Sequence, residues 1–226
     1  MIRHRLSTAL LVTFAALPAA QASSIVSASA TSLVANGSFE SPALTGSYCY
    51  LSGGGQPVPV CGGSLSGWTG NAVVIASGNG SWGGETAQSG ADFIGLQYAL
   101  GSSVFGHLSQ VLSLGAGDYQ LSWFDAGRTN WGGNATYEVL VNGQLLGSYG
   151  TSGMAWTAHS LTFHSTGSST LSFNVTGGSQ IDSTSFLDNV SITRVPEPAS
   201  WALVAVALAG LGVGSRRRSS PARSAR

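Results

Sequence analysis

The chain has 226 residues, of which 43% are hydrophobic and 8% are charged, against about 25% charged in a typical soluble domain. It contains 32 glycines and no lysine. This composition excludes a coiled coil, a helical bundle and a charge-rich disordered chain, and it favours short strands joined by glycine-rich turns within one domain.

The formal net charge of zero hides an uneven distribution of charge. Residues 23–194 contain two arginines, Arg128 and Arg194, against eight acidic residues, so this stretch carries a net charge of −6. The other seven arginines lie near the two ends of the chain. Because phosphate backbones repel an acidic domain, nucleic acid is excluded as a partner.

The N-terminal segment has the pattern of a secretory signal. Residues 1–22 begin with charged side chains, continue with an apolar run over 6–17 and end in small residues. This order is typical of a signal peptide. We expect export, with cleavage between Ala22 and Ser23.

Residues 23–194 read as an all-β domain. Apolar side chains alternate with period two in several short runs, which indicates half-buried strands. The dipeptide Asn142-Gly143 predicts a type I′ hairpin turn, because both residues accept positive φ angles. A β-sandwich of about nine strands is expected. The nine runs are 33–39, 72–76, 92–98, 108–114, 119–123, 137–141, 156–163, 171–175 and 186–193.

Cys49 and Cys61 are the only cysteines. In an exported protein such a pair normally oxidises, so we expect a structural disulfide that closes the loop between them. Zinc is the less favoured alternative, because it needs further nitrogen or sulfur ligands nearby.

Two glycine-rich loops contain tryptophans beside polar side chains. Trp82 is accompanied by Asn79 and Glu85, and Trp131 by Asn130. An exposed aromatic ring with neighbouring amide and carboxylate groups suits a sugar, so these five residues are candidate carbohydrate ligands. The alternative is that both rings fold back and cover the ends of the sandwich. The tryptophans assigned to the core are Trp68, Trp123 and Trp156.

Catalytic patterns are weak. Residues 78–83 match G-x-G-x-x-G, but no helix pattern follows them, so the match carries no nucleotide site. Carboxylate pairs for glycoside hydrolysis could come from Glu85 with Asp92 or from Asp125 with Glu138. Acids on strands and loops are usually solvated. We therefore expect a protein without enzymatic activity, and keep a secreted glycan hydrolase as the less favoured alternative.

The C-terminal tail has three ordered parts. Val195-Pro196-Glu197-Pro198 precedes an uncharged stretch over 199–215, and an arginine-rich tail over 216–226 follows. Seventeen uncharged residues reach the lower limit for a membrane helix, and the arginines would remain cytoplasmic. We expect a single transmembrane helix over 199–215, with the β-domain on the outer side. An ordinary tail anchor is the alternative.

This tail resembles the PEP-CTERM sorting signal of Gram-negative bacteria, also called the ice-binding protein C-terminal domain. The resemblance implies that an exosortase in the inner membrane recognises residues 195–198, removes the tail and passes the protein to the cell surface or the extracellular matrix. Proteins of this kind accompany exopolysaccharide and biofilm production.

The domain also resembles the choice-of-anchor C type of exported protein and, more distantly, galactose-binding-like jelly-roll modules. The resemblance rests on short motifs at 34–40, 67–68, 93–96, 108–110 and 187–190. It implies a jelly roll with neighbouring first and last strands. It also implies Glu40 and Asp188 as the ligands of a structural calcium ion.

The pattern of the last strand supports a buried carboxylate. Asp188 has the same parity as Phe186, Val190 and Ile192, which places it on the apolar face. A buried carboxylate must find a cation or several donors, and a hard cation with oxygen ligands is one such partner. The alternative is that Asp188 accepts hydrogen bonds from turn amides and Glu40 is exposed.

Together these patterns predict an exported, exosortase-processed envelope or exopolysaccharide-matrix protein that binds carbohydrate. A purely structural matrix protein without a ligand is the main alternative.

Overall fold

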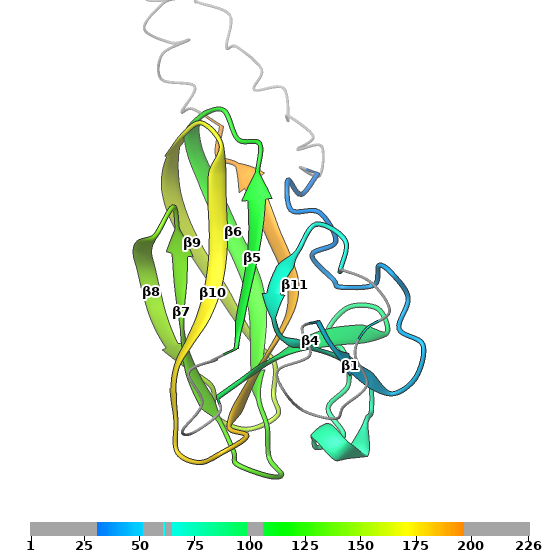
Figure 1. Ribbon diagram of the computed structural model, residues 1–226. Helices are drawn as coiled ribbons and strands as arrows, with labels where there is room; N and C mark the ends of the chain where they lie inside the picture. Colours follow the sequence, from blue (N-terminus) through cyan, green and yellow to red (C-terminus); the bar gives the residue numbers. More distant parts are fainter. Residues whose placement is uncertain (1–30, 52–60, 62–64, 99–105, 197–226) are drawn as a thin grey trace, which may run out of the picture.

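Two antiparallel sheets stack face to face in the computed structural model of the chain (Figure 1). The structure describes residues 31–51, 61, 65–98 and 106–196. The expected signal peptide, the membrane segment over 199–215 and the tail over 216–226 lie outside these residues. Within the described part of the chain, no helix has the length and apolar character needed to cross a membrane.

Sheet A has six strands and sheet B has five. In spatial order, sheet A consists of β1 (Tyr48–Tyr50), β3 (Val73–Ala76), β4 (Asp92–Gln97), β11 (Thr184–Arg194), β6 (Ala116–Gly127) and β9 (Thr157–Thr166). Sheet B consists of β2 (Thr69–Asn71), β5 (His107–Leu112), β10 (Ser169–Gly178), β7 (Ala135–Val141) and β8 (Gln144–Gly150). The expected all-β sandwich is confirmed.

Alternating side chains fill the space between the sheets. Along β6, Tyr119, Leu121 and Trp123 point inward and are at most 2% exposed. Trp68 and Trp123 lie in this main core, as expected. Trp156 does not. It is half-buried on the outer face of sheet A, where its indole N–H donates to the Thr86 carbonyl at 2.8 Å.

Eight of the nine expected strand segments are strands. The exception is 33–39, which forms a turn in which Asn36 and Phe39 have φ angles of 51° and 62°. Gly37 approaches the carbonyl of Val190 so closely that a side chain would overlap it. The Asn36-Gly37 pair therefore acts as a turn signal here rather than as part of a strand.

The hairpin turn between β7 and β8 is confirmed, with φ angles of 52° at Asn142 and 77° at Gly143. Three strands lie outside the nine expected segments: β8, which only the hairpin turn implied, and the strands β1 and β2. β1 and β2 have three residues each, too few to show a period.

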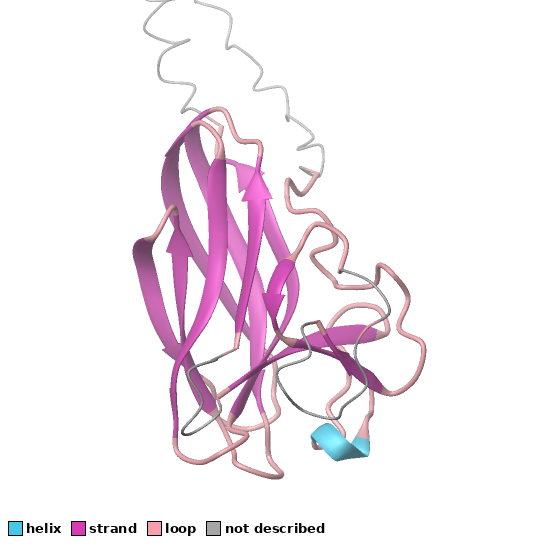
Figure 2. Cartoon of the chain, viewed as in Figure 1, coloured by secondary structure: helices cyan, strands magenta, loops and turns pink. Residues whose placement is uncertain are grey.

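The β3–β4 loop, residues 77–91, covers part of the outer face of sheet A. It contains the one short 3-10 helix of the described residues, η1 (Gly80–Trp82), drawn in cyan in Figure 2. Its Trp82 packs there in a second apolar group, which we call the outer cluster. The members of the outer cluster are Val73, Ile75, Trp82, Phe93, Ala126 and Phe186.

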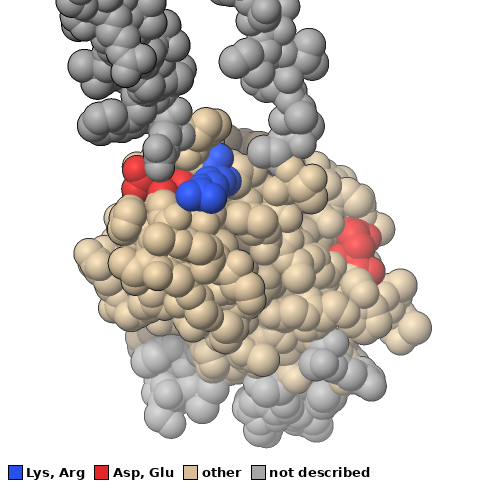
Figure 3. Space-filling model, turned by 90° about the horizontal axis from the view of Figure 1, so that it is seen from above, with Lys and Arg blue, Asp and Glu red and all other residues tan. Residues whose placement is uncertain are grey.

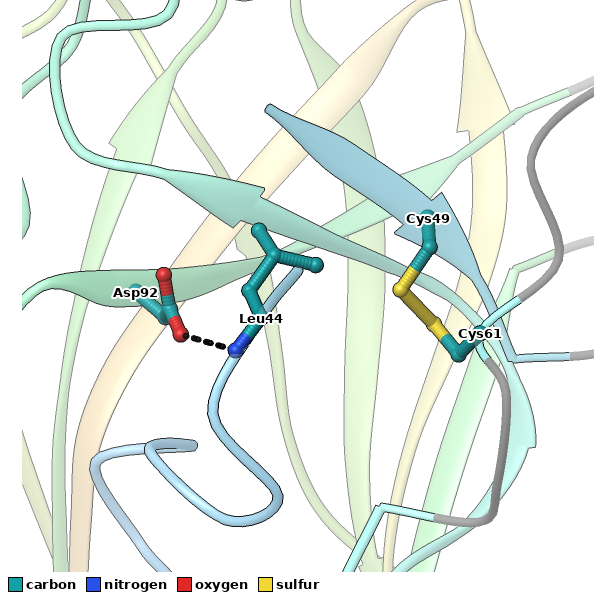
Figure 4. The surroundings of a disulfide bond; sticks show 4 residues. All are labelled: Leu44, Cys49, Cys61 and Asp92. Atoms are coloured by element: carbon teal, nitrogen blue, oxygen red, sulfur yellow. Dashed lines mark hydrogen bonds between the residues drawn. A yellow bond between two sulfur atoms is a disulfide. The ribbon is translucent and has the colours of Figure 1, made fainter. Parts of the chain in front are cut away.

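The expected disulfide joins Cys49 of β1 to Cys61, with 4.9 Å between their Cα atoms (Figure 4). The Cys61 N–H also donates to the Tyr50 carbonyl at 2.9 Å. The bridge thus fastens the chain against the short edge strand of sheet A.

Candidate functional site

Two loops meet at the end of the sandwich where β6 finishes and β11 begins (Figure 1). They are the β6–β7 loop, residues 128–134, and the β10–β11 loop, residues 179–183. The Ser183 hydroxyl donates to the Gly132 carbonyl at 2.5 Å, and the Thr184 N–H donates to the Gly133 carbonyl at 2.8 Å. Gly132 has a φ of 68° and lies against the backbone of residues 181–183, where a side chain would overlap it. We call these two loops the Trp131 end.

Trp131 is the most exposed tryptophan of the described residues, at 76% of its surface. Ile181, on the neighbouring loop, is 58% exposed. Two large apolar side chains on hydrogen-bonded loops are accessible at this end of the molecule. Trp131 is therefore exposed, as a sugar-stacking role would require, and does not fold back over the end of the sandwich.

Trp82 lies elsewhere than expected. It is 3% exposed and packs edge-on against Tyr48, with ring centroids 5.7 Å apart. The Arg128 guanidinium lies 4.3 Å from the centre of its ring, which is a cation–π contact. The ring folds back onto sheet A, so it offers no open face for stacking.

Arg128 connects the Trp131 end to the β3–β4 loop. Its guanidinium donates to the Ser81 carbonyl at 3.0 Å and to the Asn130 side-chain oxygen at 2.9 Å. Burial lowers the pKa of this guanidinium, and the neighbouring Asp182 charge partly offsets the effect. Sequence reasoning gave this residue no role. The available signal was that it is one of two arginines among residues 23–194. In the structure it is 6% exposed.

The two asparagines expected to bind a sugar form hydrogen bonds within the loops instead. Asn79 caps η1 by accepting from the Ser81 N–H at 3.0 Å, and it donates to the Ser47 carbonyl at 2.6 Å. Asn130 accepts from Arg128 and donates to the Gly80 carbonyl at 3.1 Å. Both side chains therefore hold the loops in place.

Glu85 is 6% exposed within the β3–β4 loop. One carboxylate oxygen accepts from the Thr86 N–H at 3.1 Å, and the other has no hydrogen-bond partner among the described residues. Burial raises the pKa of this carboxyl. Glu85 therefore lies buried in the β3–β4 loop rather than exposed beside an open aromatic ring.

Glu40 and Asp188 both bind the end of the β3–β4 loop. Glu40 accepts from the N–H groups of Ala91 and Asp92, each at 2.9 Å. Asp188 accepts from the Ser89 N–H at 2.9 Å and from its neighbour Asn189 at 2.6 Å. Both expected residues therefore come to one segment of the chain, although they lie 148 positions apart in sequence.

Asp188 is fully buried, as expected, but on the other side of the sheet. The pairing of β11 with β6 shifts between Asp188 and Ser191, and Asn189 has a φ of 50°. This β-bulge reverses the parity of the strand. Asp188 therefore shares the side of Phe186 in the outer cluster, whereas Val190 lies in the main core.

Burial raises the pKa of Asp188 to about 7, against the lowering effect of the amides that it accepts. The charge of Glu40 raises it further. Asp92, which accepts from the Leu44 N–H at 3.4 Å (Figure 4), has its pKa raised by burial and by Glu40. Three acids thus lie close together at the end of the β3–β4 loop. No group of three or more metal-ligating side chains occurs within the described ranges.

Hydrogen-bonded polar side chains form a chain inside the sandwich that the sequence did not lead us to expect. Trp123 donates through its indole N–H to the Tyr137 hydroxyl at 2.8 Å, and that hydroxyl donates to Asp125 at 2.7 Å. His159 Nε2 lies 2.9 Å from the other oxygen of Asp125, without the alignment of a hydrogen bond. Burial raises the pKa of Tyr137. The parity of β6 and β7 indicates inward positions for Asp125 and Tyr137, but not that they face each other.

Comparisons with known proteins bear mainly on the tail. Residues 194–218 match the PEP-CTERM protein-sorting motif. No curated protein matches the chain. The two sheets resemble solved carbohydrate-binding modules. One is TmCBM61 in complex with beta-1,4-galactotriose, at 20% identity and a TM-score of 0.42, over 57% of this chain and 90% of that one.

Two further structures are similar to a comparable degree. The CBM22-1 xylan-binding domain of Paenibacillus barcinonensis Xyn10C has 14% identity and a TM-score of 0.41, over 58% of this chain and 88% of that one. The CBM36 module in complex with calcium and xylotriose has 17% identity and a TM-score of 0.37, over 53% and 98%. The chain thus combines a two-sheet β-sandwich with a C-terminal segment that matches a PEP-CTERM protein-sorting motif.

Proposed function

We propose that this is an exported protein of a Gram-negative bacterium that an exosortase processes at residues 195–198 and releases to the cell surface or the exopolysaccharide matrix. There it binds polysaccharide without chemical turnover. The sorting motif supports the first part of this proposal. The single observation that supports binding is the 76% exposure of Trp131 on two loops that hydrogen bonds hold together.

The exposed indole of Trp131 presents its ring to the solvent. Its faces can stack on the C–H groups of a sugar ring, while nearby polar side chains accept or donate hydrogen bonds to hydroxyls. Asp182 and Gln180 lie on the loop beside it and offer such groups. Because the loops are fixed by Arg128 and Ser183, little ordering is needed on binding.

Replacing the ring tests this proposal. We expect Trp131→Ala to weaken binding of the producing bacterium's own exopolysaccharide at least about tenfold, as loss of a central aromatic contact commonly does. The melting temperature should stay unchanged, because the ring is exposed. Isothermal titration calorimetry measures the affinity.

Val111→Ala is the matched control, since Val111 is 72% exposed on β5, away from both loops. Equal affinity of Trp131→Ala and Val111→Ala would contradict binding at this end. Absence of any binding by the native protein would favour the alternative, a structural matrix protein without a ligand.

Sorting has its own test. We expect Glu197→Ala to leave an unprocessed precursor in the membrane fraction, because it removes the one charged group of the segment between two prolines. Intact-mass measurement on membrane and extracellular fractions of the native host reads the result. Ser200→Ala, three positions further on, is the control. Normal release of the Glu197 variant would exclude recognition through this motif.

The proposal includes no catalysis. The carboxylates of Asp125 and Glu138 lie on opposite sides of sheet B, since Asp125 contacts the inward Tyr137 and Glu138 has the opposite parity on β7. Such a pair does not flank a bond from two sides. A constant glycan profile after prolonged incubation with the protein is the expected result.

A structural calcium ion is the finer proposal for Glu40 and Asp188. The fully buried Asp188, with its pKa near 7, and the repulsion from Glu40 both favour a nearby cation. These two carboxylates would hold the ion, and its charge would then keep both ionised. The ion would have a structural role, because it would link β11 to residues 88–92. A melting temperature that rises with calcium and falls with chelator is expected.

A further inference from the structure

The sorting segment begins inside the folded domain. Arg194, the first residue of the matched motif, is still paired with Tyr119 in the central strand β11. Its guanidinium donates to the Ala116 carbonyl at 3.0 Å, and the next N–H, that of Val195, donates to the Asp118 carbonyl at 2.9 Å. No linker separates the strand from the motif.

Few residues then remain before the apolar run. Val195 and Ala199 are four positions apart, which spans at most about 14 Å of extended chain. A membrane-embedded enzyme that holds Pro196 in its active site must therefore lie against the end of the sandwich.

The surface that faces the enzyme comprises residues 115–118, 164–168 and 194–196, and we call it the Arg194 end. Most of its side chains are small, including Ala116, Thr166 and Ser168. Asp118 and His164 form a pair at 2.7 Å, so the charge of Asp118 has a local partner. Figure 3, which looks down on this end, shows one basic patch beside an acidic patch on a surface that is otherwise mostly tan. Such a surface permits close approach of another protein.

The start of the domain also lies at the Arg194 end. The Leu33 N–H donates to the Ile192 carbonyl at 2.8 Å, close to the end of β11 (Figure 1). Leu33 is 46% exposed and Val195 is 37% exposed, so apolar surface is available there. The Trp131 end lies at the opposite end of β11, about 33 Å away for eleven residues of strand.

We propose that the Arg194 end is the docking surface for the membrane-embedded enzyme that reads the Pro-Glu-Pro segment. The Trp131 end then points away from the membrane. This inference rests on the proposed sorting function. Docking helps cleavage because Arg194 and Val195 hold the start of the motif in one conformation, so less ordering is needed when the enzyme binds it.

A spacer tests the proposal. Six alternating glycine and serine residues followed by a second Arg-Val dipeptide are inserted between Val195 and Pro196 of the full chain. The domain then keeps its Arg194 and Val195 contacts, and the motif keeps its preceding residues. We expect processing in the native host to become about fivefold slower or more, because the rigid presentation is lost.

Processing of the spacer variant at the native rate or faster would overturn the docking proposal while leaving sorting intact. If neither the native chain nor the variant is processed, the sorting function itself fails, and the docking surface with it.

A surface variant provides a second measurement without changing the tail. Thr166→Glu introduces a charge on the Arg194 end, whereas Thr162→Glu places the same charge four residues earlier on the same outward side of β9. Both threonines are exposed, so the fold should tolerate both changes alike. Slower processing of the Thr166 variant alone is expected. Equal rates would contradict docking, and a matched melting temperature shows that both variants are folded.

Discussion

In the presence of a chelator, the domain is expected to be more stable at pH 4 than at pH 8, with Asp188 as the largest single cause. Its pKa is about 7 in the folded chain and 3.8 in the reference state. Between these values the folded state holds a proton that the unfolded state has lost, so stability falls as the pH rises. A shift of about three units corresponds to about 4 kcal/mol.

Urea unfolding at a series of pH values measures this slope. Asp188→Asn should remove most of it, because the amide carries no charge at any pH. Its single oxygen can accept from only one of the two N–H groups that Asp188 accepts, which costs about 1–3 kcal/mol at low pH. Glu138→Gln, on the outer face of sheet B, is the control and should keep the native slope.

Calcium should offset this loss of stability. A bound cation favours the ionised carboxylate, so the fall in stability between about pH 4 and pH 7 should shrink when calcium is added. An identical pH profile with calcium and with chelator would remove calcium from the proposal and leave the hydrogen bonds from Ser89 and Asn189 as the partners of Asp188.

Tyr137→Phe is expected to destabilise the domain by about 3 kcal/mol. The Tyr137 hydroxyl links the Trp123 N–H to Asp125 in the interior, so its removal leaves a donor and a carboxylate oxygen without partners. Each unsatisfied buried group costs about 1–3 kcal/mol. Chemical denaturation at constant pH gives the change in the free energy of unfolding.

Tyr149→Phe is the matched control. The Tyr149 ring stacks on Tyr137 at 5.5 Å, but no hydrogen bond joins its hydroxyl to Asp125 or Trp123. Its loss should therefore cost much less. Similar costs for the two variants would mean that packing of the rings, rather than the polar chain, stabilises this part of the core.

Local sequence patterns predict the sandwich well, because alternation along a strand depends only on which face is buried. The same patterns fail where backbone geometry changes within a few residues. At 33–39 the Asn36-Gly37 turn interrupts an apparently alternating run, and in β11 the bulge at Asn189 turns Asp188 to the other side. Neither the turn nor the bulge changes which residue types occur in the segment. The spacing of apolar residues therefore does not reveal either of them.

The candidate binding residues show a different limit. Trp82 and Trp131 have the same local sequence, a tryptophan before two glycines, yet one is 3% exposed and the other 76%. The difference arises because the β3–β4 loop folds across sheet A and brings Trp82 under Arg128. The sequence of a loop has no regular spacing of apolar residues, so it does not indicate which surface the loop covers. In addition, Arg128, the partner of Trp82, lies 46 positions away.

The direction of β11 has a mechanical consequence. A polymer held at the Trp131 end and an attachment beyond Pro196 would pull along the axis of this strand. β11 is hydrogen-bonded to β4 on one side and β6 on the other. Tension parallel to paired strands loads their hydrogen bonds together in shear, whereas a perpendicular pull opens them one after another. If the proposed binding and sorting hold, the domain would therefore transmit tension along β11 while it remains folded.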